Sequence, residues 1–286
     1  MPRKITMLTA SKALTKTFRA NGNNDPYPMV AEFTSMVVEY NTIEDMQVLL
    51  EFTAKEGGCL LKGHLSKDIA NERRAGLGLT DAHTDWMVLD YDSDGGFESL
   101  EELLNEVDPR LNEVDHIFQH SASSGLKGKS GIRGHVFFML ENQVSPMVLK
   151  QWVRKINLTS QKFRARVKLS RNAMAVCYAL DTTVNQNDKL IYVAPPILVD
   201  IEDPIPTRFE LHKRENRTYN FNTTVSAEFN RAKEQELLEE LQDQAGITPR
   251  RPKYDLSAGE EILLNPGQCV VTGVRAQGPY TRVNLN

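Results

Sequence analysis

The chain has 286 residues, of which 40% are hydrophobic and 25% are charged, and its net charge is −4. These values are typical of a globular protein with one large domain, or one domain and an appendage. The acidic balance counts against a protein that coats DNA by bulk positive charge, and no run approaches the roughly 20 apolar residues of a membrane helix.

The sequence also indicates a cellular compartment. No long apolar run follows residues 1–5, so no signal peptide is expected. Cys59, Cys177 and Cys269 are far apart and form no CxxC pair, which is typical of reduced thiols rather than of a disulfide framework or a zinc ribbon. We therefore expect a cytoplasmic protein with no membrane partner.

Apolar periodicity and turn residues predict the secondary structure. Residues 1–40 show little periodicity. Thr42, followed by Asp45, has the pattern of a capped helix start, and Gly57 ends that helix. Further along the chain we expect strands at 59–61 and 85–92, a helix at 98–107, strands at 114–120 and 134–140, a helix that starts at Ser145 and Pro146, a helical or irregular segment at 164–179, a strand at 189–193 and a long helix at 225–244.

Strands and helices alternate irregularly, which favours an α+β fold with a mixed or antiparallel sheet covered on one face. A boundary is expected near residues 216–227. We therefore divide the chain into a main domain at 1–222 and a segment at 223–286, a helical linker with the start of a following module. The strand-like end at 282–286 suggests that the chain is a piece of a longer polypeptide.

The first motif with chemical meaning is Asp90 and Asp92 at the end of the apolar strand 85–92. Residues two apart on a strand share a face, so the two carboxylates lie side by side and repel each other unless a cation lies between them. Oxygen ligands of this kind suit Mg²⁺ or Mn²⁺ with a phosphate substrate. Glycosyltransferases and nucleases use the same short motif.

A calcium-binding loop is an alternative for this segment. Asp90, Asp92, Asp94, Gly95 and Glu101 match the pattern D-x-D-x-D-G-x₅-E at every position. An EF-hand loop follows a helix, however, whereas residues 86–89 are typical of a strand. A purely structural turn is the third interpretation.

The second motif is a loop rich in serine, glycine and lysine between two expected strands. Backbone N–H groups, hydroxyls and cations in such a loop can cradle a triphosphate, and His135 on the next strand would add a donor. The alternative is a flexible hairpin loop with a core histidine. The polar residues concerned are Ser121, Ser123, Ser124, Lys127, Lys129, Arg133 and His135.

The third motif is Asp181, which follows an apolar stretch and precedes the strand 189–193. It could supply a third metal carboxylate, and the alternative is an aspartate that ends a helix. Between these motifs, residues 150–171 hold eight basic residues and no acidic one. A basic run on an acidic protein suggests a defined track for a polyanion, and the alternative is a solvated helix face.

The order of these motifs resembles the three-motif signature of archaeo-eukaryotic primases. Asp90 and Asp92 fit its first motif, the serine turn with His135 its second, and Asp181 its third. The likeness covers about residues 55–200 and is strongest to the primase–polymerase domains at the N-terminus of phage and plasmid replication proteins; residues 71–76 add to it. The insert at 126–133 departs from the pattern and leaves open which serine or lysine contacts phosphate. The zinc-binding cysteines of some relatives are absent.

The resemblance implies an RRM-like sheet joined to an N-terminal α/β unit, and a DNA primase–polymerase that acts in phage or plasmid DNA replication. Two Mg²⁺ or Mn²⁺ ions would be held by Asp90, Asp92 and Asp181, and His135 would act with them. The incoming dNTP or NTP would be bound by Ser121, Ser123, Ser124, Lys127, Lys129, Arg133, His135 and Lys189. A single-stranded DNA template would follow Arg73, Arg74, Arg154, Lys155, Arg164, Arg166 and Lys168. A helicase module often follows such a domain.

Two other functions remain as alternatives. A metal-dependent nuclease or relaxase would need a general base or a nucleophilic tyrosine, but Tyr91 should point to the face opposite the carboxylates. A non-catalytic module that binds calcium or nucleic acid would follow from the calcium-loop pattern.

Overall fold

The computed structural model describes residues 2–93, 95–126, 131–247, 261–264, 267–277 and 280–285. The chain forms two compact units: Met1–Arg166 with Tyr178–Ala227, and Val167–Cys177 with Glu228–Asn286. The boundary expected at residue 222 lies close to the last of the three junctions, between Ala227 and Glu228. The short segment Val167–Cys177 leaves the first unit and joins the second.

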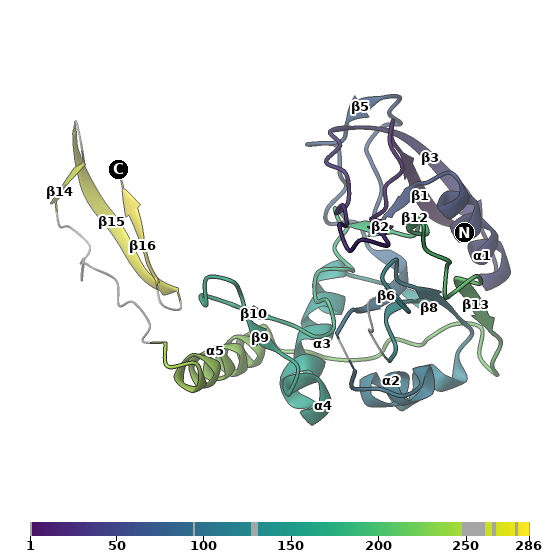
Figure 1. Cartoon of the computed structure of the whole chain (residues 1–286). Helices are drawn as coiled ribbons and strands as arrows, with labels where there is room; N and C mark the ends of the chain where they lie inside the picture. The colour runs from purple at the N-terminus through teal and green to yellow at the C-terminus, as the bar shows by residue number, and fades with distance from the viewer. Residues whose placement is uncertain are drawn as a thin grey trace. The chain divides into compact units, whose positions relative to one another are not determined.

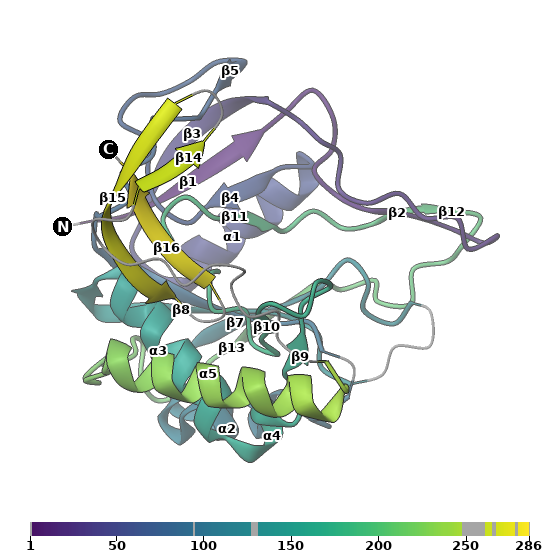
Figure 2. The same cartoon turned by 90° about the vertical axis from the view of Figure 1, so that its left-hand side faces the viewer.

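The N-terminal sheet of the first unit is antiparallel throughout (Figure 1). The strand order is β11 (Leu190–Tyr192), β4 (Cys59–Leu61), β1 (Arg3–Thr9), β3 (Glu32–Tyr40) and β5 (Glu72–Arg73). Helix α1 (Ile43–Lys55) lies against this sheet, as Figure 2 also shows. The expected capping box starts the helix, because Thr42 accepts from Asp45 N and the Asp45 carboxylate accepts from the Thr42 backbone.

A second antiparallel sheet forms the centre of the first unit. Its order is β13 (Phe209–His212), β7 (His116–His120), β8 (Gly134–Val144) and β6 (Thr84–Tyr91). The helices that accompany it are α2 (Leu100–Val107), the 3-10 helix η1 (Pro109–Glu113), α3 (Pro146–Thr159) and α4 (Gln161–Arg164).

Strand β6 contributes to two hydrophobic cores because its side chains alternate between the faces of the sheet. Met87, Leu89 and Tyr91 pack with α2 and α3, whereas Trp86 and Val88 pack with α1 and β1. Both faces of the strand are therefore covered, which accounts for its continuous apolar sequence. The position of Asp90 follows from this alternation, since it shares the face of Trp86 and Val88.

The remaining strands of the first unit are β2 (Thr17–Arg19) and β12 (Ile197–Val199), which pair in parallel. In the second unit, β9 (Lys168–Leu169) and β10 (Val176–Cys177) form a hairpin, and α5 (Ala227–Gln244) contacts it through Gln242 Nε2, which donates to Ala173 O at 2.7 Å. Strands β14 (Glu261–Leu264), β15 (Gly267–Gln277) and β16 (Tyr280–Leu285) form an antiparallel sheet.

The expected α+β class with antiparallel sheets is confirmed, and most predicted elements are found within a few residues of their expected bounds. Strands β1 and β3 were not predicted. Strand β1 buries Ile5 to Leu8 consecutively and therefore shows no period-two pattern. The segment 164–179 contains the end of α4 and a β-hairpin rather than a continuous helix. Among the residues that the structure describes, no helix is both long and apolar enough to cross a membrane.

Candidate functional site

Asp90 and His135 face each other on neighbouring strands. They are direct partners in the register of β6 and β8, and His135 Nε2 lies 3.5 Å from Asp90 Oδ2. The Asp90 side chain keeps 24% of its surface exposed, so it opens to solvent at the edge of a buried sheet. The antiparallel pairing of two strands therefore joins the first motif to the histidine of the second.

Gln119 on β7 sets the orientation of the His135 ring. Its amide nitrogen donates to His120 O at 3.0 Å, which leaves the amide oxygen to face His135 Nδ1 at 2.5 Å. An amide oxygen only accepts, so Nδ1 carries the proton and Nε2 is the nitrogen directed at Asp90. The sequence motifs did not single out Gln119; its register opposite His135 is the signal that identifies it.

Asp92 follows the end of β6 and forms an ion pair with Arg133, whose side chain is only 2% exposed. Arg133 lies just before β8, so this contact connects the two chain segments that leave the sheet. Burial of a guanidinium requires a charged partner, which explains why an arginine is accommodated here. Arg133 thus contacts the first motif directly, a pairing that the sequence interpretation did not include.

The serine loop after β7 is closed by its own hydrogen bonds. Ser121 N donates to Arg133 O at 3.1 Å, and Ser124 Oγ donates to the same oxygen at 2.9 Å. Ser121 Oγ lies 3.2 Å from Ser123 Oγ and from Ser124 Oγ. Ser121 and Ser123 line the cavity described below, whereas Ser124 stabilises the loop and is not among its lining residues.

Asp181 is brought beside Asp90 by the backbone. Its N–H donates to Asp90 O at 2.9 Å, and Leu180 forms an isolated antiparallel bridge with Tyr91. The side chain accepts from Thr183 N and Thr183 Oγ1, both at 2.7 Å, and pairs with Lys189 Nζ at 3.0 Å. The third motif therefore lies against the first, although about 90 residues separate them in the sequence.

Two buried asparagines hold this segment in place. Asn185 donates to Val88 O at 2.8 Å and accepts from Val88 N at 3.0 Å, so its amide satisfies a free edge of β6. Asn157 on α3 does the same for Leu180, accepting from Leu180 N and donating to Leu180 O, both at 3.0 Å. An amide side chain can satisfy both backbone groups of one residue, which explains the residue type at each position.

Opposing effects act on the pKa of Asp181. Burial would raise it, but hydrogen bonds from Thr183 and the charge of Lys189 together lower the pKa of this carboxyl below its ordinary value. Asp181 is therefore held as a carboxylate, the form that a cation or a positively charged side chain requires.

The three motifs line one cavity of about 210 Å³ in the first unit. Its polar lining from the motifs comprises Asp90, Asp92, Ser121, Ser123, His135, Asp181 and Lys189. Residues that were not predicted complete the wall: Lys16 from the segment before β2, Tyr27 and Tyr192. Lys16 Nζ lies 4.8 Å from the centre of the Tyr27 ring, and the Tyr27 and Tyr192 rings stack at 4.0 Å.

Charges in the cavity also act on Tyr27. Burial first, and then the carboxylates of Asp90 and Asp92, raise the pKa of its phenol well above the ordinary value. Tyr27 thus keeps its hydroxyl proton and remains a neutral hydrogen-bond donor in the wall of the cavity. Neither its turn-rich surroundings nor any motif indicated this role in the sequence.

Some expected site residues lie elsewhere. Asp94, Lys127 and Lys129 fall outside the described residues. A strand, β6, precedes the calcium-loop pattern, and Glu101 pairs with Arg214 at 3.4 Å. Tyr91 is fully buried and its hydroxyl donates to Gly95 O at 2.7 Å, which leaves it unable to attack a strand as a relaxase tyrosine would.

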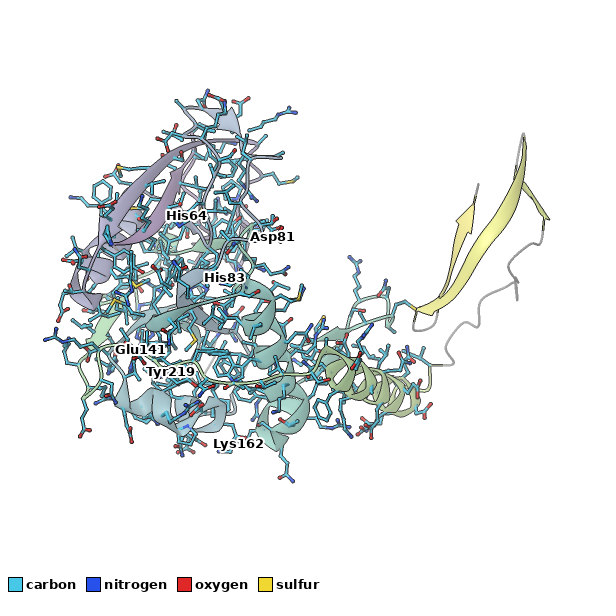
Figure 3. All side chains as sticks on the ribbon, turned by 180° about the vertical axis from the view of Figure 1, so that it is seen from behind. His64, Asp81, His83, Glu141, Lys162 and Tyr219 are labelled. Atoms are coloured by element: carbon cyan, nitrogen blue, oxygen red, sulfur yellow. The ribbon has the colours of Figure 1, made fainter. Side chains whose placement is uncertain are left out.

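The basic run at 150–171 does not form one helix face. It passes through α3, α4 and β9, and Lys168 and Arg171 belong to the second unit. Lys162, which Figure 3 shows at the α4 end of the first unit, pairs with Glu102. Arg166 reaches the loop after Asp92 and packs against Gly96. The approach is so close that a side chain at position 96 would clash, because its Cβ would lie 2.1 Å from Arg166 Nε.

The other expected template-binding residues lie on separate elements of the first unit. Arg154 and Lys155 are half-buried on α3, with the Arg154 guanidinium 5.9 Å from the centre of the Tyr178 ring, and Arg164 ends α4. Arg73 and Arg74 lie at β5, next to a second groove. The structure therefore separates these residues into at least two groups.

Within the described part of the chain, no three histidine, cysteine or acidic side chains are close enough together to hold a metal ion. Asp92 and Asp181 are instead neutralised by Arg133 and Lys189. Comparisons of this chain with protein-family models, with curated proteins and with solved structures found no match.

Proposed function

We propose that this chain is a template-directed nucleotidyltransferase, a DNA primase–polymerase of phage or plasmid replication that uses two metal ions. The observation that carries the proposal is the single cavity lined by Asp90, Asp92 and Asp181 together with His135 and Lys189. Three carboxylates beside cationic and hydroxyl groups form the donor set expected for a divalent cation with a nucleoside triphosphate.

The topology supports the finer fold expected from the primase resemblance. In chain order, β6, α2, β7, β8 and α3 are followed by the segment at Leu180, which bridges to β6. The arrangement across the sheet is therefore Leu180, β6, β8 and β7, the order that a β-α-β-β-α-β unit produces. An RRM-like sheet with Asp90 and His135 on its two inner strands agrees with this order.

Asp90, Asp92 and Asp181 line one cavity but, within the described residues, are not grouped closely enough to hold an ion as they stand. In this mechanism their carboxylates would draw together to hold the metal ions. Bound Mg²⁺ or Mn²⁺ supplies charge neutralisation for the attacking 3′-hydroxyl and the departing pyrophosphate. His135, oriented by Gln119, would donate from Nε2 to a phosphate oxygen when both ring nitrogens are protonated. Lys189, which lines the cavity and pairs with Asp181, would neutralise the charge that develops on the triphosphate. Arg133 is buried, pairs with Asp92 and is not among the cavity-lining residues, so its expected contact with the nucleotide stays a prediction.

Phosphoryl transfer of this kind depends on positioning and charge rather than on a protein nucleophile. The site supplies positioned side chains and charged groups. It does not need Tyr91 as a nucleophile, and Tyr91, which lies between Asp90 and Asp92 in the sequence, is buried. No specific observation in the site favours the calcium-binding or the nuclease alternative. A C-terminal helicase module stays a prediction.

The test is a strand-synthesis assay with single-stranded DNA, dNTPs or NTPs, and Mg²⁺ or Mn²⁺, with and without a primer. We expect the wild type to extend or start strands, and the Asp90→Asn, Asp92→Asn double variant to lose synthesis by at least about a thousandfold. Product without a primer would identify a primase, and product only with a primer a polymerase.

The matched control is Asp68→Asn with Asp200→Asn, which removes two exposed carboxylates away from the cavity and should leave synthesis unchanged. Full activity of the Asp90, Asp92 variant would refute the metal assignment. Degradation of the labelled strand would instead favour a nuclease. No reaction, with calcium raising the melting temperature, would favour a binding module.

A further inference from the structure

A second groove adjoins the candidate active site. It has a volume of about 820 Å³ and shares Tyr27, Leu190 and Tyr192 with the smaller cavity of about 210 Å³. Cavities that enclose a drug-sized ligand measure roughly 300–1,000 Å³. The smaller cavity can therefore hold phosphates and cations but not a whole nucleotide, and the groove beyond the Tyr27–Tyr192 stack has ample room.

The lining of the groove combines aromatic and apolar surface. The Tyr27 and Tyr192 rings stack at 4.0 Å with an interplanar angle of 20°. Met29 is completely exposed and adds apolar surface to the lining of the groove. Flat aromatic faces beside exposed apolar surface are what unpaired nucleobases stack on, whatever their sequence.

Positive charge lies along the same groove. Arg73 is exposed on β5, and Arg74 lies 6.0 Å from the centre of the Phe33 ring. The Arg74 Nη1 donor reaches Asp188 O at 3.1 Å, which uses one of the five N–H donors of the guanidinium. This contact and the packing on Phe33 hold the Arg74 side chain in place, so that little side-chain entropy is lost when it binds a phosphate.

We propose that this groove binds single-stranded nucleic acid, with one or more unpaired bases stacked beside the Tyr27–Tyr192 pair and the backbone phosphates on Arg73 and Arg74. Stacking surfaces with a positive track are typical of sequence-independent single-strand binding. A duplex buries its base faces within its own stack and gains only the phosphate contacts. That the bound strand serves as the template rests on the proposed function, whereas the binding itself does not.

The test measures fluorescence anisotropy of a labelled oligothymidylate of about 12 nucleotides, with a chelator present so that metal ions play no part. The wild type should bind the single strand more tightly than the matching duplex. Arg73→Gln with Arg74→Gln should weaken binding about tenfold, and should reduce the slope of log affinity against log salt by about 1.4, as two lost phosphate contacts require.

The matched control is Lys4→Gln with Lys55→Gln, which removes two exposed positive charges from β1 and α1, outside the groove. This control should bind within about twofold of the wild type. Tyr27→Phe, which keeps the ring, should bind as the wild type does, while Tyr27→Leu should bind about fivefold more weakly. Equal binding by the arginine variant and its control would overturn the proposal.

A cross-linking experiment keeps the proposal testable if Tyr27→Leu does not fold. The wild-type protein would be irradiated with an oligonucleotide that contains 5-iodouracil, and the linked peptides identified by mass spectrometry. Links at Tyr27 or Tyr192 are expected. Links confined to α3 and α4 would overturn the proposal, because they would place the strand along the basic run instead.

The two proposals fail in different ways. Groove-dependent binding without strand synthesis would refute the polymerase function and leave the single-strand site standing. Strand synthesis by the wild type, with the Arg73, Arg74 variant binding the oligonucleotide as tightly as its control does, would refute the groove and leave the polymerase function standing.

Discussion

At the scale of single residues, Lys62 is a lysine in an unusual environment, because its side chain is buried. Lys62 is 1% exposed, and its Nζ donates to Thr84 Oγ1 at 2.5 Å and lies 4.0 Å from the centre of the Trp86 ring. Burial lowers the pKa of Lys62 to about 7, and the negative charge of Asp85 opposes the shift. The backbone N–H of Lys62 donates to Lys189 O, so this buried amine lies one strand away from the candidate site.

The lowered pKa of Lys62 predicts a pH-dependent stability. Between about pH 7 and about pH 10.5 the unfolded chain holds a proton that the folded chain has released, so stability should rise with pH across this window. Below about pH 7 both states are protonated and the full burial penalty remains. Lys62→Met should therefore raise the melting temperature more at about pH 6.5 than at about pH 9.5, measured by circular dichroism.

The control is Lys55→Met on the exposed end of α1, which should change the melting temperature little at either pH. A gain from Lys62→Met that is the same at both pH values would show that the amine titrates normally in the folded protein.

At the scale of elements, the site depends on how β6 is completed at its open edge. The segment that carries Asp181 runs beside β6, but Asn185 replaces the usual backbone partner by offering its amide to both polar groups of Val88. A buried backbone N–H or C=O without a hydrogen-bond partner lowers the stability of the folded state. By bonding to Val88, Asn185 therefore stabilises β6 and also holds the segment that positions Asp181.

Replacement of this asparagine should be strongly destabilising. Asn185→Ala leaves Val88 N–H and C=O buried without a partner and should lower the free energy of unfolding by about 2–4 kcal/mol. Asn105→Ala, on the exposed face of α2, is the matched control and should change it by less than about 0.5 kcal/mol. Urea unfolding followed by tryptophan fluorescence would decide; equal midpoints for both variants would contradict the role of the Asn185 amide.

At the scale of the whole molecule, the three hydrophobic core clusters of the described residues all lie in the first unit. None of the described core clusters includes a residue after Val225. The contact between Gln242 and Ala173 belongs to the second unit alone. The first unit therefore contains what a cooperative domain requires.

A chain that ends at Ala227 should fold on this basis. We expect a cooperative thermal transition within a few degrees of the full chain, because the apolar surface that drives folding is retained. Near-ultraviolet circular dichroism reports on Trp86 and Trp152, which both lie in the retained part. A non-cooperative melt, or the loss of the aromatic signal, would mean that the second unit contributes to the core.

Local patterns determined much of this protein from the sequence alone. The capping residues Thr42 and Asp45 were sufficient to place the start of α1, and the apolar run before Asp90 was sufficient to place β6. Such features depend on neighbours within a few residues, whose hydrogen bonds and side-chain directions follow from backbone geometry. The α+β class followed from the alternation of these elements.

Only the tertiary structure decided how the site is assembled. The bond from Asp181 N to Asp90 O, the wall formed by Lys16, Tyr27 and Tyr192, and the loss of Ser124 from the cavity all involve residues distant in the sequence or held by loop hydrogen bonds. These positions are set by the hydrogen bonds that buried polar groups must form and by the packing of the two cores. The strand period of two residues and the helix period of 3.6 residues contain no information about either.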